Sequence, residues 1–220
     1  MPIIDGAKFF SPPSEQWCRW VVNYIVHLIE DVHSKKKTCN ILLTGGETAK
    51  SCYEEWAKSV FHLDNVNFFM GDERFVPLEH EESNSGMVQR TLFKNGISSK
   101  SNFYPITPEI FENGELLSKY SMSILRPDII LLGVGWDGHV ASIFPENFNL
   151  VPEKSGYTVV ESLKHKYKRV TISQDIIINC HRVILLARNK LDIFRLVNSN
   201  DESSLINLPA IIVKDKIWIV

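Results

Sequence analysis

The sequence predicts an α/β fold of three layers, in which a mainly parallel sheet is flanked by helices on both faces. Two observations carry this prediction. Short apolar runs alternate with amphipathic stretches along the chain, which is the pattern of right-handed crossovers between parallel strands. The apolar runs are also continuous rather than alternating, and strands that are buried on both faces have this composition.

Composition places the chain among globular proteins. It has 220 residues, of which 44% are hydrophobic and 23% charged, so we expect one domain spanning residues 1–220. A net charge of −2 gives no reason to expect nucleic acid or a membrane as a partner. The four cysteines show neither a C-x-x-C pair nor zinc spacing with histidines, which predicts free thiols. With no signal-peptide pattern at the N-terminus, we expect a cytoplasmic protein. We expect a monomer because the sequence shows no exposed apolar stripe.

The expected elements follow in chain order. Residues 13–35 form an amphipathic helix, because Trp17, Val21, Ile25 and other apolar residues recur at helical spacing. Strands are expected at residues 40–44, 66–70, 128–132 and 182–187, with further strand candidates at 157–160, 169–173, 211–213 and 217–220. Helices are expected at residues 47–60, 84–94, 108–125 and 190–197, and Ser83 with Asn84 can cap the second of these. Residues 71–82 are interpreted as a charged loop.

Glycines and polar residues gather where four expected strands end. In an open α/β sheet, ligands bind beyond the carboxyl ends of the strands. This edge therefore predicts a ligand site. The four ends carry residues 44–48 (TGGET), residues 71–74 (GDER), residues 133–139 (GVGWDGH), and Arg188 with Lys190.

The first of these ends predicts an anion site. Residues 44–51, TGGETAKS, superficially resemble a Walker phosphate loop, but Thr44 and Ala49 occupy its two glycine positions, which excludes that motif. A strand, two glycines and a helix start remain, and the free N–H groups of a helix N-terminus bind anions. Gly45 and Gly46 are therefore expected to contact an anionic group; the alternative is a plain tight turn.

Residues 133–138, GVGWDG, match the dinucleotide pattern G-x-G-x-x-G. Pro145 leaves only residues 139–144 for the crossover helix, and Asp137 would repel a pyrophosphate. We therefore interpret the segment as a turn that presents Asp137 and His139, with His139 at the start of a short helix. Histidine titrates near neutral pH and suits general base catalysis. The other six histidines, at positions 27, 33, 62, 80, 165 and 181, are interpreted as structural.

Charged residues complete the candidate site. Residues 72–74 (DER) form either a solvated turn or a substrate clamp. Arg169 begins a strand and Lys190 begins a helix, and either side chain can pair with a phosphate. A G-x-S-x-G elbow is absent from the sequence, which gives no support for a serine hydrolase. The residues alone thus indicate a metal-free α/β enzyme that acts on a small phosphorylated substrate, with His139 as the base.

Five ordered blocks resemble the 6-phosphogluconolactonase family. They are LLTGGET (42–48), GDERFVP (71–77) with SN (83–84), LLGVGWDGHVASIFP (131–145), KRVTIS (168–173) and LPA (208–210). The resemblance implies a three-layer, Rossmann-like fold of the NagB/RpiA/CoA transferase-like type, shared with glucosamine-6-phosphate deaminase and ribose-5-phosphate isomerase. Residues 141–145, ASIFP, follow the lactonase pattern rather than the Asn-Glu-Pro pattern of deaminases. Ala187, where lactonases often have glycine, departs from the pattern and weakens the assignment of Lys190.

The resemblance also implies an activity. The reaction would be hydrolysis of 6-phospho-D-glucono-1,5-lactone to 6-phospho-D-gluconate in the oxidative pentose phosphate pathway, without a metal or organic cofactor. His139 would activate water as the general base, and Asp137 would orient His139. A sugar-phosphate isomerase or deaminase, or a sensor that binds without turnover, remains the alternative. The implied substrate-binding residues are Gly45, Gly46, Thr48, Asp72, Arg74, Asn84, Gly135, Arg169 and Lys190.

Overall fold

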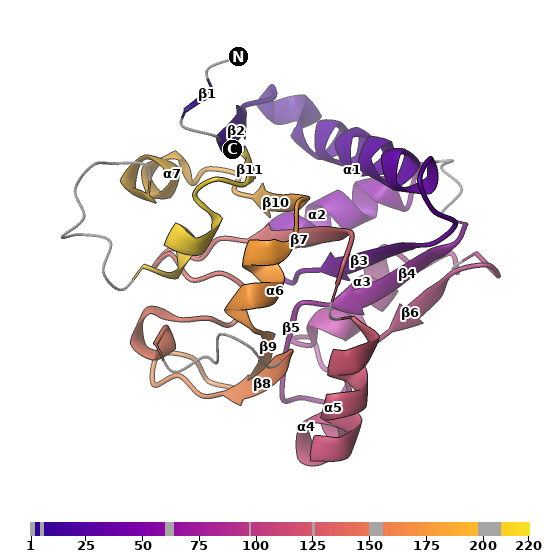
Figure 1. The fold of residues 1–220 in the computed structure, drawn as a ribbon, viewed down its shortest axis with the longest axis vertical. Helices are drawn as coiled ribbons and strands as arrows, with labels where there is room; N and C mark the ends of the chain where they lie inside the picture. Colours follow the sequence, from indigo (N-terminus) through magenta and orange to yellow (C-terminus); the bar gives the residue numbers. More distant parts are fainter. Residues whose placement is uncertain are drawn as a thin grey trace.

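The computed structural model describes residues 3–4, 7–59, 64–96, 98–124, 126–149, 156–197 and 208–220. Among these residues, the larger of two sheets has eight strands in the order β1-β2-β11-β10-β7-β3-β4-β6 (Figure 1). Neighbouring strands are parallel except for β1 and β2, which confirms the mainly parallel sheet. The strands are β1 (Ile3–Ile4), β2 (Ala7–Phe10), β3 (Cys39–Leu43), β4 (Val66–Met70), β6 (Asn102–Tyr104), β7 (Ile129–Gly133), β10 (Val183–Leu186) and β11 (Ile217–Ile219).

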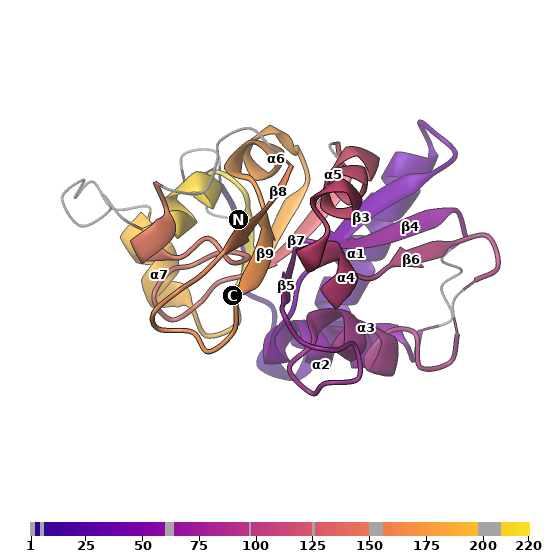
Figure 2. The same ribbon diagram turned by 90° about the horizontal axis from the view of Figure 1, so that it is seen from below.

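Helices cover both faces of this sheet, as the sequence predicts. Ile41, Leu131 and Ile184, on three central strands, are fully buried, and burial of each such side chain contributes about 1.5–3 kcal/mol. Figure 2 shows α2 and α3 on one side of β3, β4 and β6, and α5 on the other. The helices are α1 (Trp17–His33), α2 (Glu47–Trp56), α3 (Asn84–Thr91), α4 (Pro108–Glu112), α5 (Gly114–Ser123), α6 (Gln174–Asn179) and α7 (Leu191–Val197).

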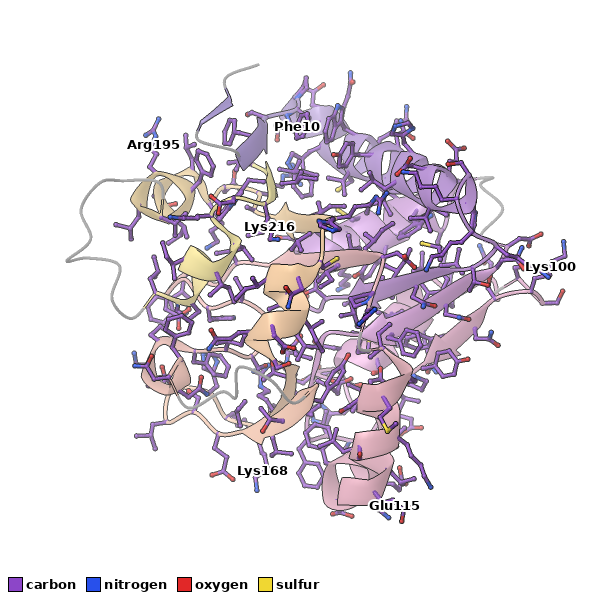
Figure 3. All side chains as sticks on the ribbon, in the orientation of Figure 1. Phe10, Lys100, Glu115, Lys168, Arg195 and Lys216 are labelled. Carbon is purple, nitrogen blue, oxygen red and sulfur yellow. The ribbon has the colours of Figure 1, made fainter. Side chains whose placement is uncertain are left out.

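The first helix, α1, confirms the amphipathic pattern. Val21, Ile25 and Ile29 recur every four residues and are all buried, because this spacing places side chains on one face of a helix. Charged side chains project from the periphery of the molecule, as Lys100 and Glu115 do in Figure 3. Among the described residues, none of the helices is both long and apolar enough to cross a membrane.

A second, smaller sheet was not expected. It contains β5 (Asp72–Arg74), β9 (Arg169–Ile172) and β8 (Tyr157–Val160), all antiparallel. The predicted loop over residues 71–82 is therefore wrong at its start. The backbone N–H of Ile172 donates to the carbonyl of Gly71 at 3.0 Å, so pairing with β9 makes residues 72–74 a strand despite their charges. This sheet continues directly from the end of β4 (Figure 1).

Near the C-terminus, the strand predicted at residues 211–213 is wrong. These residues belong to the 3₁₀ helix Pro209–Val213. Pro209 has no N–H for a strand ladder, and Ala210 and Val213, three positions apart, are buried together. The Ala210 N–H donates to the carbonyl of Gly138 at 2.9 Å, so this helix contacts the loop after β7. The final predicted strand is confirmed as β11.

The single helix predicted at residues 108–125 is two helices. Asn113 has an extended backbone between α4 and α5, and its side chain accepts hydrogen bonds from the N–H groups of Glu115 and Leu116 at 3.0 and 3.2 Å. Asn113 thus caps α5, as polar side chains commonly do at helix starts. Residue 125 and the predicted end of the earlier helix at residue 60 lie outside the described residues. Strands β1, β2 and β6 and helix α6 were not predicted.

Candidate active site

The glycine turn after β3 starts helix α2. Gly46 has φ 92° and ψ 162°, a conformation that in practice only glycine adopts. At Gly45 a Cβ atom would lie 1.9 Å from the Asn84 side-chain oxygen, so a side chain is excluded there as well. The first N–H groups of a helix have no partner within it. The turn therefore exposes backbone donors at the positive end of α2.

Strand β5 ties the second loop to helix α3. The Glu73 carboxylate is 1% exposed and accepts from the backbone N–H groups of Asn84 (2.8 Å) and Ser85 (2.6 Å) and from the Ser83 hydroxyl (3.1 Å). Burial raises the pKa of Glu73, and these backbone donors oppose that change. Asp72, also buried, accepts from the Ser142 hydroxyl at 2.6 Å. Of the predicted charged triplet, Glu73 thus anchors the loop.

The small sheet contributes two arginines, Arg74 from β5 and Arg169 from β9. Arg74 pairs with Glu82 at 2.9 Å, and the guanidinium of Arg169 lies 5.9 Å from the centre of the Phe144 ring. In both arginines Nε is buried without a hydrogen-bond partner among the described residues. Burial lowers the pKa of Arg169, and the nearby Asp72 carboxylate opposes that shift. Two cations with spare donors suit the binding of an anion.

The loop after β7 holds its own shape through backbone hydrogen bonds. The N–H of Gly135 donates to the carbonyl of His139 at 2.9 Å, and the N–H of Gly138 donates to the carbonyl of Gly135 at 3.1 Å. At Gly135 a Cβ atom would lie 2.1 Å from the His139 ring. The short helix predicted from His139 is wrong: residues 139–144 form turns and isolated bridges, because Val140 bridges to Val134 and bends the chain back.

Asp137 and His139 form a hydrogen-bonded pair in this loop. Nδ1 of His139 lies 2.6 Å from Oδ1 of Asp137, and the side chains are 23% and 7% exposed. Burial disfavours an ionised Asp137, but the hydrogen bond and charge of His139 outweigh it and lower the pKa of Asp137 to about 2. An ionised carboxylate only accepts hydrogen bonds, so Nδ1 carries the proton and Nε2 of a neutral His139 is free to accept one.

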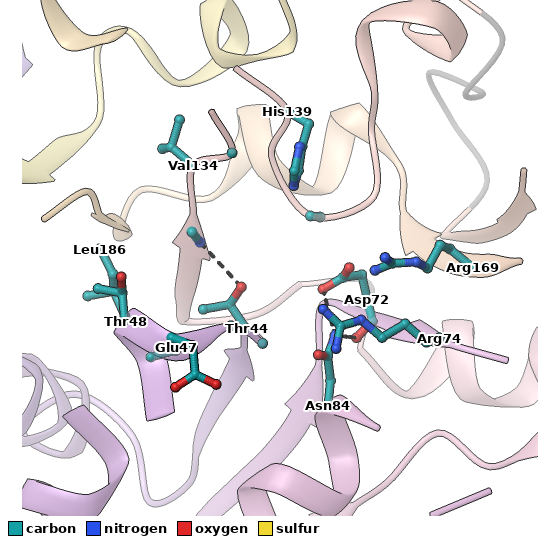
Figure 4. Close-up of a pocket in the computed structure, with 16 residues that line it drawn as sticks. Thr44, Glu47, Thr48, Asp72, Arg74, Asn84, Val134, His139, Arg169 and Leu186 are labelled. Carbon is teal, nitrogen blue, oxygen red and sulfur yellow. Dashed lines mark hydrogen bonds between the residues drawn. The ribbon is translucent and has the colours of Figure 1, made fainter. Parts of the chain in front are cut away.

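These loops surround one cavity of about 210 Å³. That is below the roughly 300–1,000 Å³ of sites for drug-sized ligands, so it suits a small molecule better than a dinucleotide. His139, from the loop after β7, and Arg169, from β9, face the cavity from two sides (Figure 4). Asp137 stands behind His139, and Lys190 does not line the cavity. The predicted residues that line it are Gly45, Gly46, Thr48, Asp72, Arg74, Asn84, Gly135, His139 and Arg169.

Other residues in and beside the cavity were not predicted individually as binding residues, although some of them lie in the strand-end segments 44–48 and 133–139 that predict the site. The Thr44 hydroxyl accepts from the N–H of Gly133 at 3.2 Å, which joins the ends of β3 and β7. The Tyr53 hydroxyl bonds to both backbone groups of Thr44. The position of Thr44 at a strand end could have identified it from the sequence, whereas no local sequence pattern identifies Tyr53. The further lining residues are Thr44, Glu47, Ala49, Gly133, Val134, Ala141 and Leu186.

His165 was interpreted as structural, yet it lies beside the pair. Its ring is 5.5 Å from the His139 ring and 4.2 Å from the Phe144 ring. Burial, followed by the charges of His139 and Arg169, lowers the pKa of His165. Ligand atoms of Asp137, His139 and His165 lie within 4.8 Å of one another. Sequence spacing could not reveal this cluster, because the small sheet brings distant segments together.

An α/β sheet with these loops at one edge matches a known family. The chain belongs to the glucosamine-6-phosphate isomerase/6-phosphogluconolactonase family, whose model matches residues 12–218. Within that family, similar proteins are named 6-phosphogluconolactonase. The one from Thermotoga maritima is 29% identical over 214 residues, covering 91% of this chain and 92% of that protein. The one from Treponema pallidum is 31% identical over 195 residues, covering 80% of each.

Solved structures share the fold. The crystal structure of 6-phosphogluconolactonase from Thermotoga maritima superimposes with a TM-score of 0.77 at 27% identity. The match covers 97% of this chain and 99% of that one. The predicted family and the predicted three-layer fold are therefore both confirmed.

Proposed function

We propose that this protein hydrolyses 6-phospho-D-glucono-1,5-lactone to 6-phospho-D-gluconate in the oxidative pentose phosphate pathway. The observation that carries the proposal is the Asp137–His139 pair, joined at 2.6 Å, on a cavity that Arg74 and Arg169 also line. The names of the relatives from Thermotoga maritima and Treponema pallidum support the same reaction. The reaction needs a base for water and cations for the phosphate, and the cavity offers both.

In this proposal, His139 acts as the general base. Nε2 takes a proton from water while the water oxygen attacks the C1 carbonyl carbon of the lactone. The imidazolium that forms lies beside the ionised Asp137, which stabilises the new charge. The tetrahedral intermediate then collapses, the bond from C1 to the ring oxygen breaks, and the ring oxygen leaves as a hydroxyl with the proton from His139. General base catalysis of this kind contributes about 10²–10⁴-fold in rate.

The phosphate would bind between the small sheet and helix α2. Arg169 and Arg74 supply guanidinium donors, and the turn at Gly45 and Gly46 supplies backbone N–H groups at a helix N-terminus. Contacts to the phosphate, at the far end of the substrate, hold C1 in place for attack by water. This positioning lowers the entropic part of the activation barrier. Lys190, outside the cavity lining, remains a prediction as a phosphate ligand.

The proposal also includes the class of partner, the cellular compartment and the oligomeric state. A balanced net charge of −2 supports a small-molecule substrate rather than nucleic acid. The four cysteines are free thiols, which supports a reducing compartment such as the cytoplasm. We also expect a single domain that acts as a monomer. Measurement of molar mass by light scattering tests the monomer.

The test is lactone hydrolysis with a matched pair of variants. The lactone is generated in situ, its product is followed by a coupled dehydrogenase, and the spontaneous rate is subtracted. We expect His139→Ala to lower kcat by about 10²–10⁴-fold with little change in KM, because the phosphate contacts remain. His181→Ala, at an exposed histidine outside the cavity, should behave like the wild type.

Three outcomes would contradict parts of the proposal. A His139→Ala variant with wild-type kcat would remove His139 as the base. Release of ammonia from glucosamine 6-phosphate, without hydrolysis of the lactone, would place the chain with the isomerases and deaminases of its family. Binding of 6-phosphogluconate without any turnover would indicate a sensor.

A further inference from the structure

The turn before β9 brings a third potential ligand to the Asp137–His139 pair. The His165 ring stacks on Phe144 at an angle of 26° and lies nearly edge-on to His139, at 83°. Strand β9 pairs with β5 on one side and β8 on the other, which holds the turn against the catalytic loop. The proposed hydrolysis gives His165 no role.

Two buried polar atoms of this cluster lack partners. Among the described residues, neither Oδ2 of Asp137 nor Nε2 of His165 has a hydrogen bond, although the Asp137 side chain is only 7% exposed. A buried polar atom without a partner costs about 1–3 kcal/mol. Such atoms are rare in folded proteins and indicate a water or an ion at the site. A carboxylate and an imidazole are both ligands of transition metals.

The donor set fits a zinc-type ion. One oxygen of Asp137 and one nitrogen each of His139 and His165 lie within 4.8 Å of one another. Zinc bonds of about 2.0–2.1 Å in a tetrahedron place ligand atoms about 3.3 Å apart. Side-chain shifts of about 1 Å would bring the three ligand atoms to this separation. Mg²⁺ and Ca²⁺ prefer oxygen ligands, whereas two imidazoles and a carboxylate suit Zn²⁺ and its neighbours.

Charged side chains near the cluster both favour and oppose the binding of a cation. Glu146, which accepts a hydrogen bond from Ser162 at the start of the same turn, adds a second carboxylate near the cluster. The Arg169 guanidinium lies 5.9 Å from the centre of the Phe144 ring, and its positive charge opposes a cation at the cluster.

We propose that Asp137, His139 and His165 bind a divalent transition ion of the zinc type, and that this ion inhibits the enzyme. The ion binding stands on the cluster alone, whereas the inhibition rests on the proposed function. An imidazole nitrogen that coordinates an ion cannot accept a proton from water. Binding of the ion and activation of water by His139 therefore exclude one another.

Ion binding is tested on the full, metal-stripped chain without substrate. Zn²⁺ affinity is measured by competition with a chromophoric chelator, and Co²⁺ absorption reports coordination by nitrogen and oxygen ligands. His165→Phe keeps an aromatic ring against Phe144 but removes both ring nitrogens. We expect micromolar or tighter Zn²⁺ binding by the wild type and an affinity at least about 10-fold weaker in this variant. Mutation of a residue that only hydrogen-bonds to a metal ligand already lowers metal affinity by about 10-fold, and His165 is proposed as a ligand itself. His181→Phe is the matched control and should bind like the wild type.

Equal Zn²⁺ affinity of the wild type and His165→Phe, or failure of the wild type to bind Zn²⁺ at micromolar concentrations, would overturn the site. Inhibition is a separate measurement. We expect hydrolysis by the wild type to fall along its Zn²⁺ binding curve and to return with EDTA. Acceleration by Zn²⁺, or unchanged hydrolysis at full occupancy, would overturn the inhibitory role. Failure of the metal-free protein to hydrolyse the lactone would contradict the proposed function, and the binding data alone would then decide the ion site.

Discussion

Asp137 links the stability of the protein to the geometry of its site. Its carboxylate accepts from both the backbone N–H (3.2 Å) and Nδ1 (2.6 Å) of His139. These contacts fix the orientation of the imidazole, and the His139 side chain lines the cavity. A sequence pattern of Asp-Gly-His predicts the pair, and Gly138, with φ 80°, allows the tight turn that brings the two side chains together.

The pKa of Asp137, lowered from 3.8 to about 2, predicts how stability depends on pH. A carboxyl group with a lower pKa in the folded state stabilises that state above the unfolded pKa and loses this contribution as pH falls through the folded pKa. We expect up to about 2 kcal/mol from this group, lost between about pH 4 and pH 2.

Urea unfolding of the wild type and Asp137→Asn at several pH values measures this effect. The difference in unfolding free energy between the two proteins should shrink as pH falls from 4 to 2. Asp215→Asn, at an exposed position, controls for the loss of one negative charge. A difference that stays constant across this range would show that Asp137 is not held ionised by His139.

At the scale of elements, Gly46 decides whether helix α2 can start where it does. Its φ of 92° and ψ of 162° cost a residue with a side chain about 1–3 kcal/mol. We expect Gly46→Ala to lower the free energy of unfolding by that amount and to raise KM, because the N–H groups of the turn shift. Chemical denaturation and lactone kinetics measure the two effects.

Gly114, at the start of α5, offers the matched control. It has open space around its Cα atom and lies outside the left-handed region. Gly114→Ala should therefore be neutral or stabilise by about 0.4–1 kcal/mol, through the unfolded chain. If the two alanine variants were equally stable, the backbone conformation of Gly46 would not be a constraint on α2.

Elements with a strong hydrophobic pattern could be predicted from the sequence. Elements that form only by pairing with a distant strand could not. Helix α1 and strand β4 match their predicted positions closely, because burial fixes their residue types. Strand β8 also matches its predicted position, although Tyr157 is its one buried residue. Asp72–Arg74 look like a loop in sequence, but pairing with β9 makes them a strand. Similarly, the loops at the strand ends predict most of the candidate site, whereas His165 joins it through contacts that no local pattern encodes.

At the scale of the whole molecule, the cavity depends on both sheets. Thr44 and Gly133 come from the ends of the large sheet, and Arg74 and Arg169 from the small one. The sheets are joined where Ser142 donates to Asp72 and where Ile172 donates to Gly71. A ligand in this cavity contacts both sheets, so its binding energy stabilises their arrangement.

We therefore expect one cooperative thermal transition that the product shifts as a whole. At a 6-phosphogluconate concentration of about 100 Kd, binding adds about 2.7 kcal/mol, and a domain of this size gains about 2–4 °C in Tm per kcal/mol, which gives roughly 5–10 °C. Calorimetry should show one peak before and after the shift, and Arg169→Ala should reduce the shift at the same concentration. Two peaks, of which the product moves only one, would show that the sheets unfold separately and that the single-domain prediction fails.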